Sequence, residues 1–267
     1  MRELLPYIGI CDFMNFSQVQ EMLAVFQANL PKGMKRKLMV GAMMSHKTLH
    51  NLSTEWAKVF PDKNTVASIF GSEEAYNCLH YVVSQFDNRE LWRDIAIAIS
   101  HYGGLDIHAI QLDRAIWPDP GQIANGVHTA RRHVEVILQI NGTALDEVDN
   151  EPSKLVRKLK DYEGVVHRIL LDKSMGRGLT LNPEELAPFI RAIKSDLPWL
   201  GVGVAGGLGP DTLEIIQPLV EEFPDLSIDA QSRLRSSGNA VDPIDWDMAK
   251  AYLVNALKVV TPKVVTP

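Results

Sequence analysis

Short runs of apolar, often β-branched residues alternate along the chain with longer segments whose apolar positions recur at helical spacing. Strands that are buried on both faces read as nearly continuous apolar runs, whereas amphipathic helices repeat every three or four residues. We interpret a further apolar run, Val66–Phe70, as part of a long connection after the second strand. The pattern predicts eight strands, at Tyr7–Cys11, Lys37–Met43, Cys78–Val83, Ile107–Leu112, Val134–Gln139, Val166–Leu171, Gly201–Ala205 and Leu226–Asp229.

Helix start signals stand between several of these strands. Ser17 precedes the first helical segment. Asn182 is followed by Pro183 and two acids, the order typical of an N-cap, a first helical residue and a negatively charged first turn. We also expect a helix from Pro210, with Pro218 kinking or shortening it. The chain is therefore read as a series of strand–helix units.

Eight such units are the number that closes a parallel barrel. An open doubly wound sheet is disfavoured, because the first strand lacks the glycine-rich turn typical of that fold. The predicted fold is a single α/β domain, a (β/α)8 or TIM barrel with eight parallel strands, spanning residues 1–257. Residues 258–267, in which KVVTP occurs twice, are expected to form a C-terminal tail.

Charge and cysteine content restrict the classes of partner. The formal net charge is −6, with 27 basic residues scattered among 33 acids, so nucleic-acid binding is not expected. No apolar run approaches the roughly 18 residues that cross a bilayer, and no signal sequence opens the chain. Cys11 and Cys78 lie in apolar runs, which suits a reduced protein. We expect a cytoplasmic monomer or homodimer that binds a small molecule and no membrane.

The turns after the seventh and eighth strands are the best candidates for a phosphate site. Active sites of such barrels form at the carboxyl ends of the strands. Gly206 and Gly207 allow close backbone approach, and the helix expected at Pro210 would point free N–H groups at an anion. Ser232 and Arg233 could add a hydroxyl and a guanidinium. The alternative is a pair of surface turns.

Cys11 at the end of strand one and Asp172 at the end of strand six are the candidate catalytic pair. A thiolate and a carboxylic acid across the barrel mouth can act as base and acid. This needs a lowered pKa of the thiol, which arginines and helix termini of the rim could provide. The alternatives are a buried apolar cysteine and a salt-bridged aspartate.

Other polar residues past the strand ends allow different chemistry. Lys173 could form a Schiff base in a sugar-phosphate lyase or aldolase. Asp113 and Arg177 are candidate ligand contacts. His46 and His50 have the spacing of a metal pair on a helix, but no third ligand accompanies them in a recognisable pattern. We therefore expect no metal and no cofactor.

Several motifs occur in the order expected of one known barrel family. They are Ile10-Cys11, Ile110–Leu112, Ile169–Asp172, Gly176–Gly178, Ala205–Leu208 and Ile228-Asp229. Together they resemble phosphoribosylanthranilate isomerase, a family of tryptophan biosynthesis. The similarity is concentrated between residues 165 and 235.

The resemblance implies an intramolecular oxidoreductase, that is, an isomerase that performs an Amadori rearrangement on a phosphoribosyl amine. It implies that Cys11 is the general base, that Asp172 is the general acid and that Asp229 contacts the substrate. It also places Gly206-Gly207 in a phosphate cradle. Asp113 stands where the family has a histidine. The differences from the family pattern point to a diverged relative that acts on another phosphorylated ribose-type substrate, or to a catalytically silent barrel that binds phosphate ligands.

Overall fold

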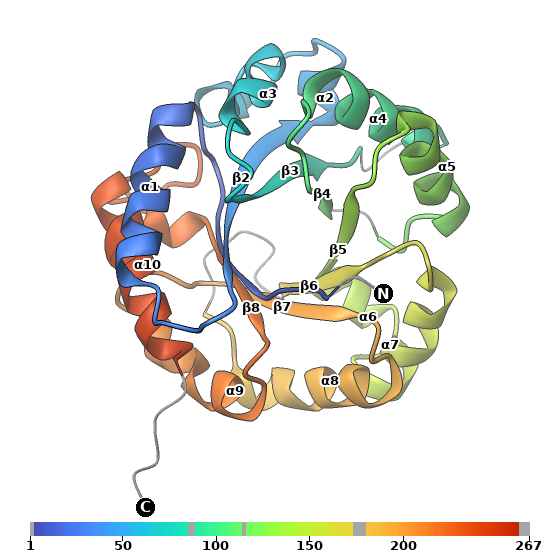
Figure 1. Ribbon diagram of the computed structural model, residues 1–267. Coiled ribbons are helices and arrows are strands. Elements are labelled where there is room, and N and C mark those ends of the chain that lie inside the picture. The colour runs from blue at the N-terminus through green and yellow to red at the C-terminus, as the bar shows by residue number, and fades with distance from the viewer. Residues whose placement is uncertain (1–2, 85–88, 114–115, 173–179, 262–267) are drawn as a thin grey trace, which may run out of the picture.

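The computed structural model describes residues 3–84, 89–113, 116–172 and 180–261, and its strands form a closed parallel barrel (Figure 1). Each strand pairs with the next one along the chain, and β8 pairs with β1 to close the ring. The predicted (β/α)8 fold is confirmed. The strands are β1 (Tyr7–Ile10), β2 (Lys37–Ser45), β3 (Tyr76–Val82), β4 (Ala109–Asp113), β5 (Glu135–Asn141), β6 (Arg168–Asp172), β7 (Gly201–Ala205) and β8 (Ser227–Ala230).

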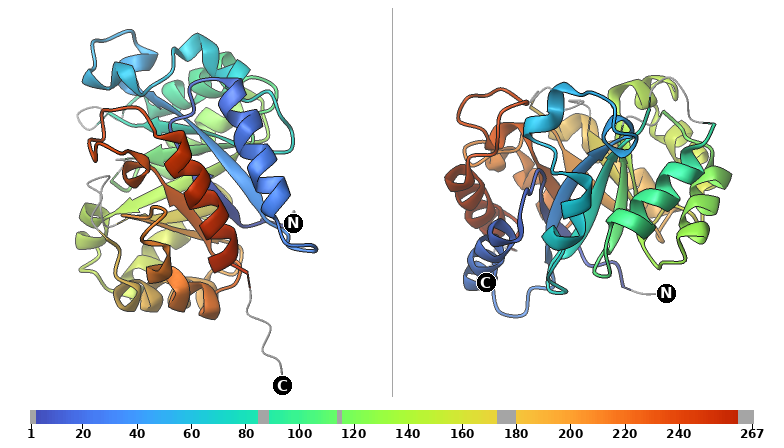
Figure 2. Two further views of the ribbon diagram at one scale, coloured as in Figure 1. Left: turned by 90° about the vertical axis from the view of Figure 1, so that its left-hand side faces the viewer. Right: turned by 90° about the horizontal axis from the view of Figure 1, so that it is seen from above.

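Helices surround the barrel. Figure 2 shows α1 and α10 side by side on its outer surface, as the pairing of β1 with β8 requires. Within the part of the chain that is described, no helix combines the length and the apolarity needed to cross a membrane. The α-helices are α1 (Phe16–Asn29), α2 (His46–Leu49), α3 (Val66–Ile69), α4 (Leu91–Ile97), α5 (Pro120–Ala130), α6 (Gly142–Asp146), α7 (Pro152–Leu159), α8 (Pro183–Asp196), α9 (Gln217–Glu222) and α10 (Trp246–Val259).

Local start signals explain several helix boundaries. Helix α8 begins as predicted, because the Asn182 side chain accepts a hydrogen bond from the N–H of Glu184 and Pro183 occupies the first turn. Helix α1 is instead capped by Asn15, which forms a reciprocal pair of hydrogen bonds with Gln18, so Ser17 lies inside the helix. Helix α3 places the run at Val66 in the connection after β2, as interpreted. The last helix continues to Val259, two residues past the expected end of the barrel at residue 257.

The helix expected to begin at Pro210 is not formed. Residues 210–212 are turns, a 3-10 helix follows at Leu213–Ile216, and α9 begins at Gln217. The Thr212 hydroxyl accepts from the N–H of Gly209 and donates to the carbonyl of Gly207, which stabilises the turn conformation. Pro218 lies in the first turn of α9, where its missing N–H costs nothing, so it separates two short helices instead of kinking a long one.

Alternation along each strand divides the side chains between two layers. Ile8 and Ile10 of β1 pack outward in the large core beneath the helices, whereas Tyr7 and Cys11 belong to the cluster inside the barrel. In β1, therefore, odd-numbered residues face the barrel interior and even-numbered residues face the surrounding helices. Residues at the carboxyl ends of the strands that continue the inner set point toward the barrel mouth.

A buried ion pair closes the opposite end of the barrel. Arg168 donates to Glu135 at 2.7 Å, and the Tyr76 hydroxyl donates to the same carboxylate at 2.6 Å. The guanidinium also lies over the rings of Tyr7 and Tyr76. These residues open their strands, so they form a rigid base at the end of the barrel away from the candidate site.

Candidate active site

Two adjoining cavities lie at the carboxyl ends of the strands. The smaller has a volume of about 30 Å³, and the larger has a volume of about 410 Å³. Both are lined by His80, Gln139, Asp172, Gln231 and Ser232. The smaller cavity is additionally lined by Asp229, Gly206 and Gly207. The carboxyl ends of β3, β5, β6 and β8 therefore converge on one polar site, as expected for this fold.

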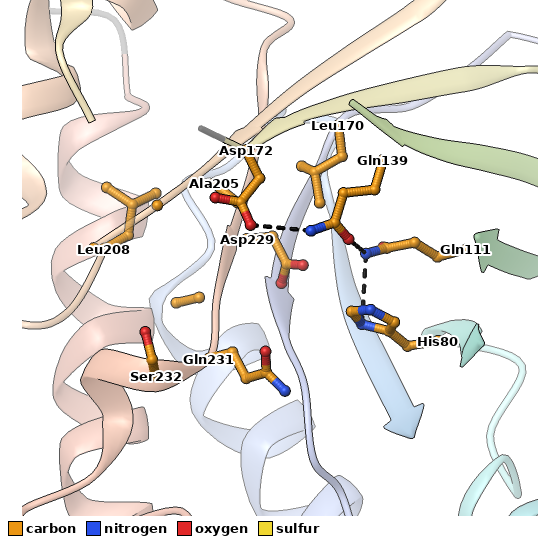
Figure 3. A pocket seen from close by; sticks show the side chains of 13 residues that line it. His80, Gln111, Gln139, Leu170, Asp172, Ala205, Leu208, Asp229, Gln231 and Ser232 are labelled. Atoms are coloured by element: carbon orange, nitrogen blue, oxygen red, sulfur yellow. Dashed lines mark hydrogen bonds between the residues drawn. The ribbon is translucent and has the colours of Figure 1, made fainter. Parts of the chain in front are cut away.

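Hydrogen-bonded side chains from consecutive strands cross the smaller cavity (Figure 3). Gln139 donates to the Asp172 carboxylate at 3.0 Å, and Gln111 donates to the Gln139 amide oxygen at 2.9 Å. The Gln111 amide nitrogen lies 3.5 Å from Nδ1 of His80. This chain fixes the orientation of Asp172 at the cavity wall.

Asp229 is a buried carboxyl group that titrates near neutral pH. Burial raises its pKa to about 7; the charge of Asp172 raises it as well, while His80 and a hydrogen bond from Cys11 act in the opposite direction. Figure 3 shows its side chain beside those of Asp172 and Gln139. A group with this pKa can exchange a proton efficiently at physiological pH.

Cys11 lies against Asp229 but has the wrong electrostatic surroundings for a thiolate. Its Sγ is 3.6 Å from Oδ2 of Asp229 and 3.5 Å from Nδ1 of His80. Burial raises the pKa of the thiol well above its usual value, and the negative charges of Asp229 and Asp12 raise it further. The expectation that the rim lowers this pKa is therefore wrong. Cys11 is buried and is not among the described residues that line the two cavities.

His80, which lies within the third apolar run of the sequence, lines both cavities. Burial is the largest single influence on its pKa and lowers it, but Asp113, Asp229 and Asp12 together outweigh burial, so the pKa is raised. Its Nε2 lies 3.5 Å from Oδ2 of Asp113, within ion-pair range but without hydrogen-bond geometry. The carboxylates around His80 thus favour the protonated form of its imidazole. Only its inward position on β3 could have indicated this role.

A second buried ion pair joins the segments that follow β1 and β8. The guanidinium of Arg235 contacts the Asp12 carboxylate and also donates to the carbonyl of Gln231 at 2.7 Å. Gln231 donates to Asp12 at 2.9 Å. Burial raises the pKa of Asp12, and Arg235 opposes this. Sequence reasoning missed this pair, because its members are 223 residues apart.

The candidate phosphate ligands are partly brought together. Gly206 and Gly207 have φ values of 117° and 65°, a backbone region that favours glycine, and they line the smaller cavity with Ser232. Arg233 is exposed and is not among the described residues that line either cavity. Without the expected helix at Pro210, no helix dipole is available there. Asp113 lines the larger cavity, whereas Arg177 and Lys173 lie outside the described residues.

The larger cavity is shaped by the long connection after β2. That connection contributes Lys47 and the apolar side chains of Leu52, Trp56 and Phe60 to its wall. The rings of Trp56 and Phe60 stack with centroids 6.0 Å apart. The larger cavity thus combines an apolar, aromatic wall from this connection with polar and charged groups at the strand ends, and small-molecule sites use both kinds of group.

Comparison with known proteins supports the fold. No protein-family model and no curated protein matches the sequence. The tryptophan synthase α chain from Legionella pneumophila subsp. pneumophila matches with a TM-score of 0.53 and 12% identity, over 98% of this chain and 94% of that chain. The tryptophan synthase α subunit from Legionella pneumophila str. Paris matches with a TM-score of 0.52 and 12% identity, over 96% of this chain and 92% of that chain.

A third solved structure, the triosephosphate isomerase from Bartonella henselae, matches with a TM-score of 0.48 and 11% identity, over 96% of this chain and 99% of that chain. The two tryptophan synthase structures show that this chain shares their barrel fold. At such identities the comparison extends to the fold alone.

Proposed function

We propose that this protein is an isomerase of a phosphorylated ribose-type substrate, with Asp229 as general base and Asp172 as general acid. The observation that carries the proposal is that these two carboxyl groups line one cavity and that the pKa of Asp229 is raised to about 7. The charges of these two neighbouring carboxyl groups act on each other, so the pair is suited to holding one proton on Asp172 while the Asp229 carboxylate accepts another. Asp229 thus takes the role that the sequence resemblance implied for Cys11.

The chemistry conserves atoms and needs no oxidant. In a phosphoribosyl amine, the Asp172 carboxyl protonates the ring oxygen as the bond from C1 to that oxygen breaks, which leaves an open-chain iminium ion. The Asp229 carboxylate removes the proton from C2, and the electron pair moves to form an enaminol. The enaminol gains a proton at C1 and loses one from the C2 hydroxyl, which yields the ketone.

The remaining cavity walls suit the two ends of such a substrate. Gly206, Gly207 and Ser232 line the smaller cavity together with Asp229 and are assigned to the phosphate. The larger cavity, with Trp56 and Phe60 in its wall, is assigned to the group carried on C1. His80, whose raised pKa favours the protonated form, lies beside the carboxyl groups and is assigned to stabilising negative charge that develops on the C2 oxygen.

Solvent exchange tests the reaction directly. The protein is incubated in D2O with N-aryl ribosylamine 5-phosphates and ribose 5-phosphate, and loss of the C2 proton signal and formation of ketose are followed by NMR. The wild type is expected to exchange the C2 proton and to form the ketose, whereas Asp229→Asn and Asp172→Asn are expected to do neither. Ribose 5-phosphate should still raise the melting temperature of both variants, because binding is retained.

The same change at an exposed carboxylate, Asp225→Asn, serves as the control and is expected to leave the activity unchanged, because that side chain forms an ion pair with Lys194 and does not line either cavity. Thermal stabilisation by phosphate esters without any exchange would identify a silent binding barrel. Full activity of Asp229→Asn would contradict the assignment of the base.

A further inference from the structure

Two histidines and one aspartate converge outside the smaller cavity. Nδ1 of His46 lies 2.8 Å from one carboxylate oxygen of Asp94, and Nε2 of His50 lies 2.8 Å from the other. His46 opens α2 and His50 directly follows it, whereas Asp94 belongs to α4. Figure 1 shows these two helices next to each other at the edge of the barrel. All three ligand atoms lie within 4.8 Å of one another.

We propose that His46, His50 and Asp94 bind a divalent transition metal ion of the zinc class. Two imidazole nitrogens and a carboxylate are a donor set that suits zinc and its neighbours, whereas calcium and magnesium prefer oxygen ligands. Zinc bonds of about 2.0–2.2 Å in tetrahedral geometry place neighbouring ligand atoms about 3.3 Å apart. The two nitrogen–oxygen separations, each of 2.8 Å and to a different carboxylate oxygen, would widen by about 0.5 Å on metal binding.

The surroundings of Asp94 resemble the outer shell of a metal site. The Tyr81 hydroxyl donates to Oδ2 of Asp94 at 2.6 Å, and Tyr81 comes from β3 and is fully buried. Carboxylates that ligate metals are commonly fixed by such a hydrogen bond. Asp94 is itself buried, and a buried carboxylate requires positive charge beside it.

The site adjoins the larger cavity. His46 lines that cavity, next to Lys47. Three protein ligands leave at least one coordination position open for water or a bound molecule. The inference does not depend on the isomerase proposal, because Asp172 and Asp229 are not part of this cluster.

Metal titration tests the site without reference to turnover. Protein freed of metal by chelator dialysis is titrated with Co²⁺ and with Zn²⁺, and binding is followed by calorimetry and by the visible absorption of Co²⁺. We expect one ion per chain and a rise in the melting temperature, because the ion binds the folded state. His50→Gln and Asp94→Asn are expected to remove the absorption band.

Two further variants sharpen the result. Tyr81→Phe is expected to bind one ion about 10–100-fold more weakly, as outer-shell changes do. His128→Gln alters an exposed histidine on α5 and is expected to bind as the wild type does. If Asp94→Asn does not fold, His50→Gln decides, since its side chain is partly exposed. Equal Co²⁺ affinity in the wild type and His50→Gln would overturn the proposal and leave a purely hydrogen-bonded cluster.

Discussion

The Sγ atom of Cys11 lies 3.6 Å from the Asp229 carboxylate, although 218 residues separate the two in the chain. Their contact places a neutral thiol behind a carboxyl group that faces the cavity. Because burial and nearby carboxylates raise the pKa of the thiol, the geometry favours Asp229 as the group that takes a proton.

Replacement of Cys11 separates the two candidate bases. Cys11→Ala is expected to keep kcat/KM within about tenfold of the wild type, because the thiol does not ionise in the working pH range. In Asp229→Asn, kcat/KM is expected to fall by about 10²–10⁴-fold, the usual contribution of a general base. Steady-state kinetics with the substrate identified by solvent exchange gives both values. A loss in Cys11→Ala as large as that in Asp229→Asn would restore the cysteine as the base.

The pH profile should report the ionisation of Asp229. As the base, this carboxyl must be charged, so kcat/KM is expected to rise as the pH increases through about 7. The profile is measured between pH 5 and 9 in buffers of constant ionic strength. The Cys11→Ala variant should keep the same rising limb, and a rate that falls as the pH passes 7 would exclude this role.

The free energy of unfolding should fall as the pH rises, whereas kcat/KM rises. The pKa of Asp229 is about 7 in the folded protein, against about 3.9 in an unfolded chain. Between these values the folded state holds a proton that the unfolded state has lost, so this group stabilises the fold at low pH and the contribution disappears as the pH rises through 7. Asp229→Asn should therefore gain stability relative to the wild type between pH 5 and pH 8, on the order of 2 kcal/mol. Urea unfolding at both pH values measures this, and Asp225→Asn should show no such trend.

The Asp12–Arg235 pair should be costly to break from one side. Arg235→Met leaves a buried carboxylate unpaired and is expected to destabilise the protein by about 3–5 kcal/mol in urea unfolding. In the double variant Arg235→Met/Asp12→Asn, the loss in free energy of unfolding should be smaller than the sum of the two single losses. Asparagine tolerates the φ of 68° at this position, so the second change adds little backbone strain. Arg191→Met breaks an exposed pair with Glu222 and should cost less than about 1 kcal/mol. Equal losses for Arg191→Met and Arg235→Met would contradict this account.

The strands could be predicted from the sequence because parallel strands covered on both faces are apolar throughout. All eight expected runs overlap a strand of the structure, and each boundary lies within two residues of the expected one. The stretch after β7 could not be predicted. The segment from Pro210 has helical spacing, but hydrogen bonds of Thr212 with Gly207 and Gly209 hold a turn there instead.

The site was predicted less completely, because its chemistry depends on contacts between distant strands. Asp172 was found as a polar residue at the end of an apolar run, and Asp229 was found through the family resemblance. His80 and Gln139 lie within or at the end of such runs, and period-two alternation does not tell which of its two faces points into the barrel. Asp94 was missed as a partner of His46 for a similar reason: it lies on another helix, 48 residues away.

The pairing of β8 with β1 also sets the order of events during synthesis on the ribosome. Cys11 precedes Asp229 by 218 residues, which at about 5–20 residues per second corresponds to about 10–40 s of translation. During that interval the inward-facing polar residues of β3 to β6 already exist, but the ring that shields them is open. The partly folded chain exposes this open barrel until β8 has been synthesised. Pairing of β8 with β1 then closes the barrel and completes the candidate site in one step.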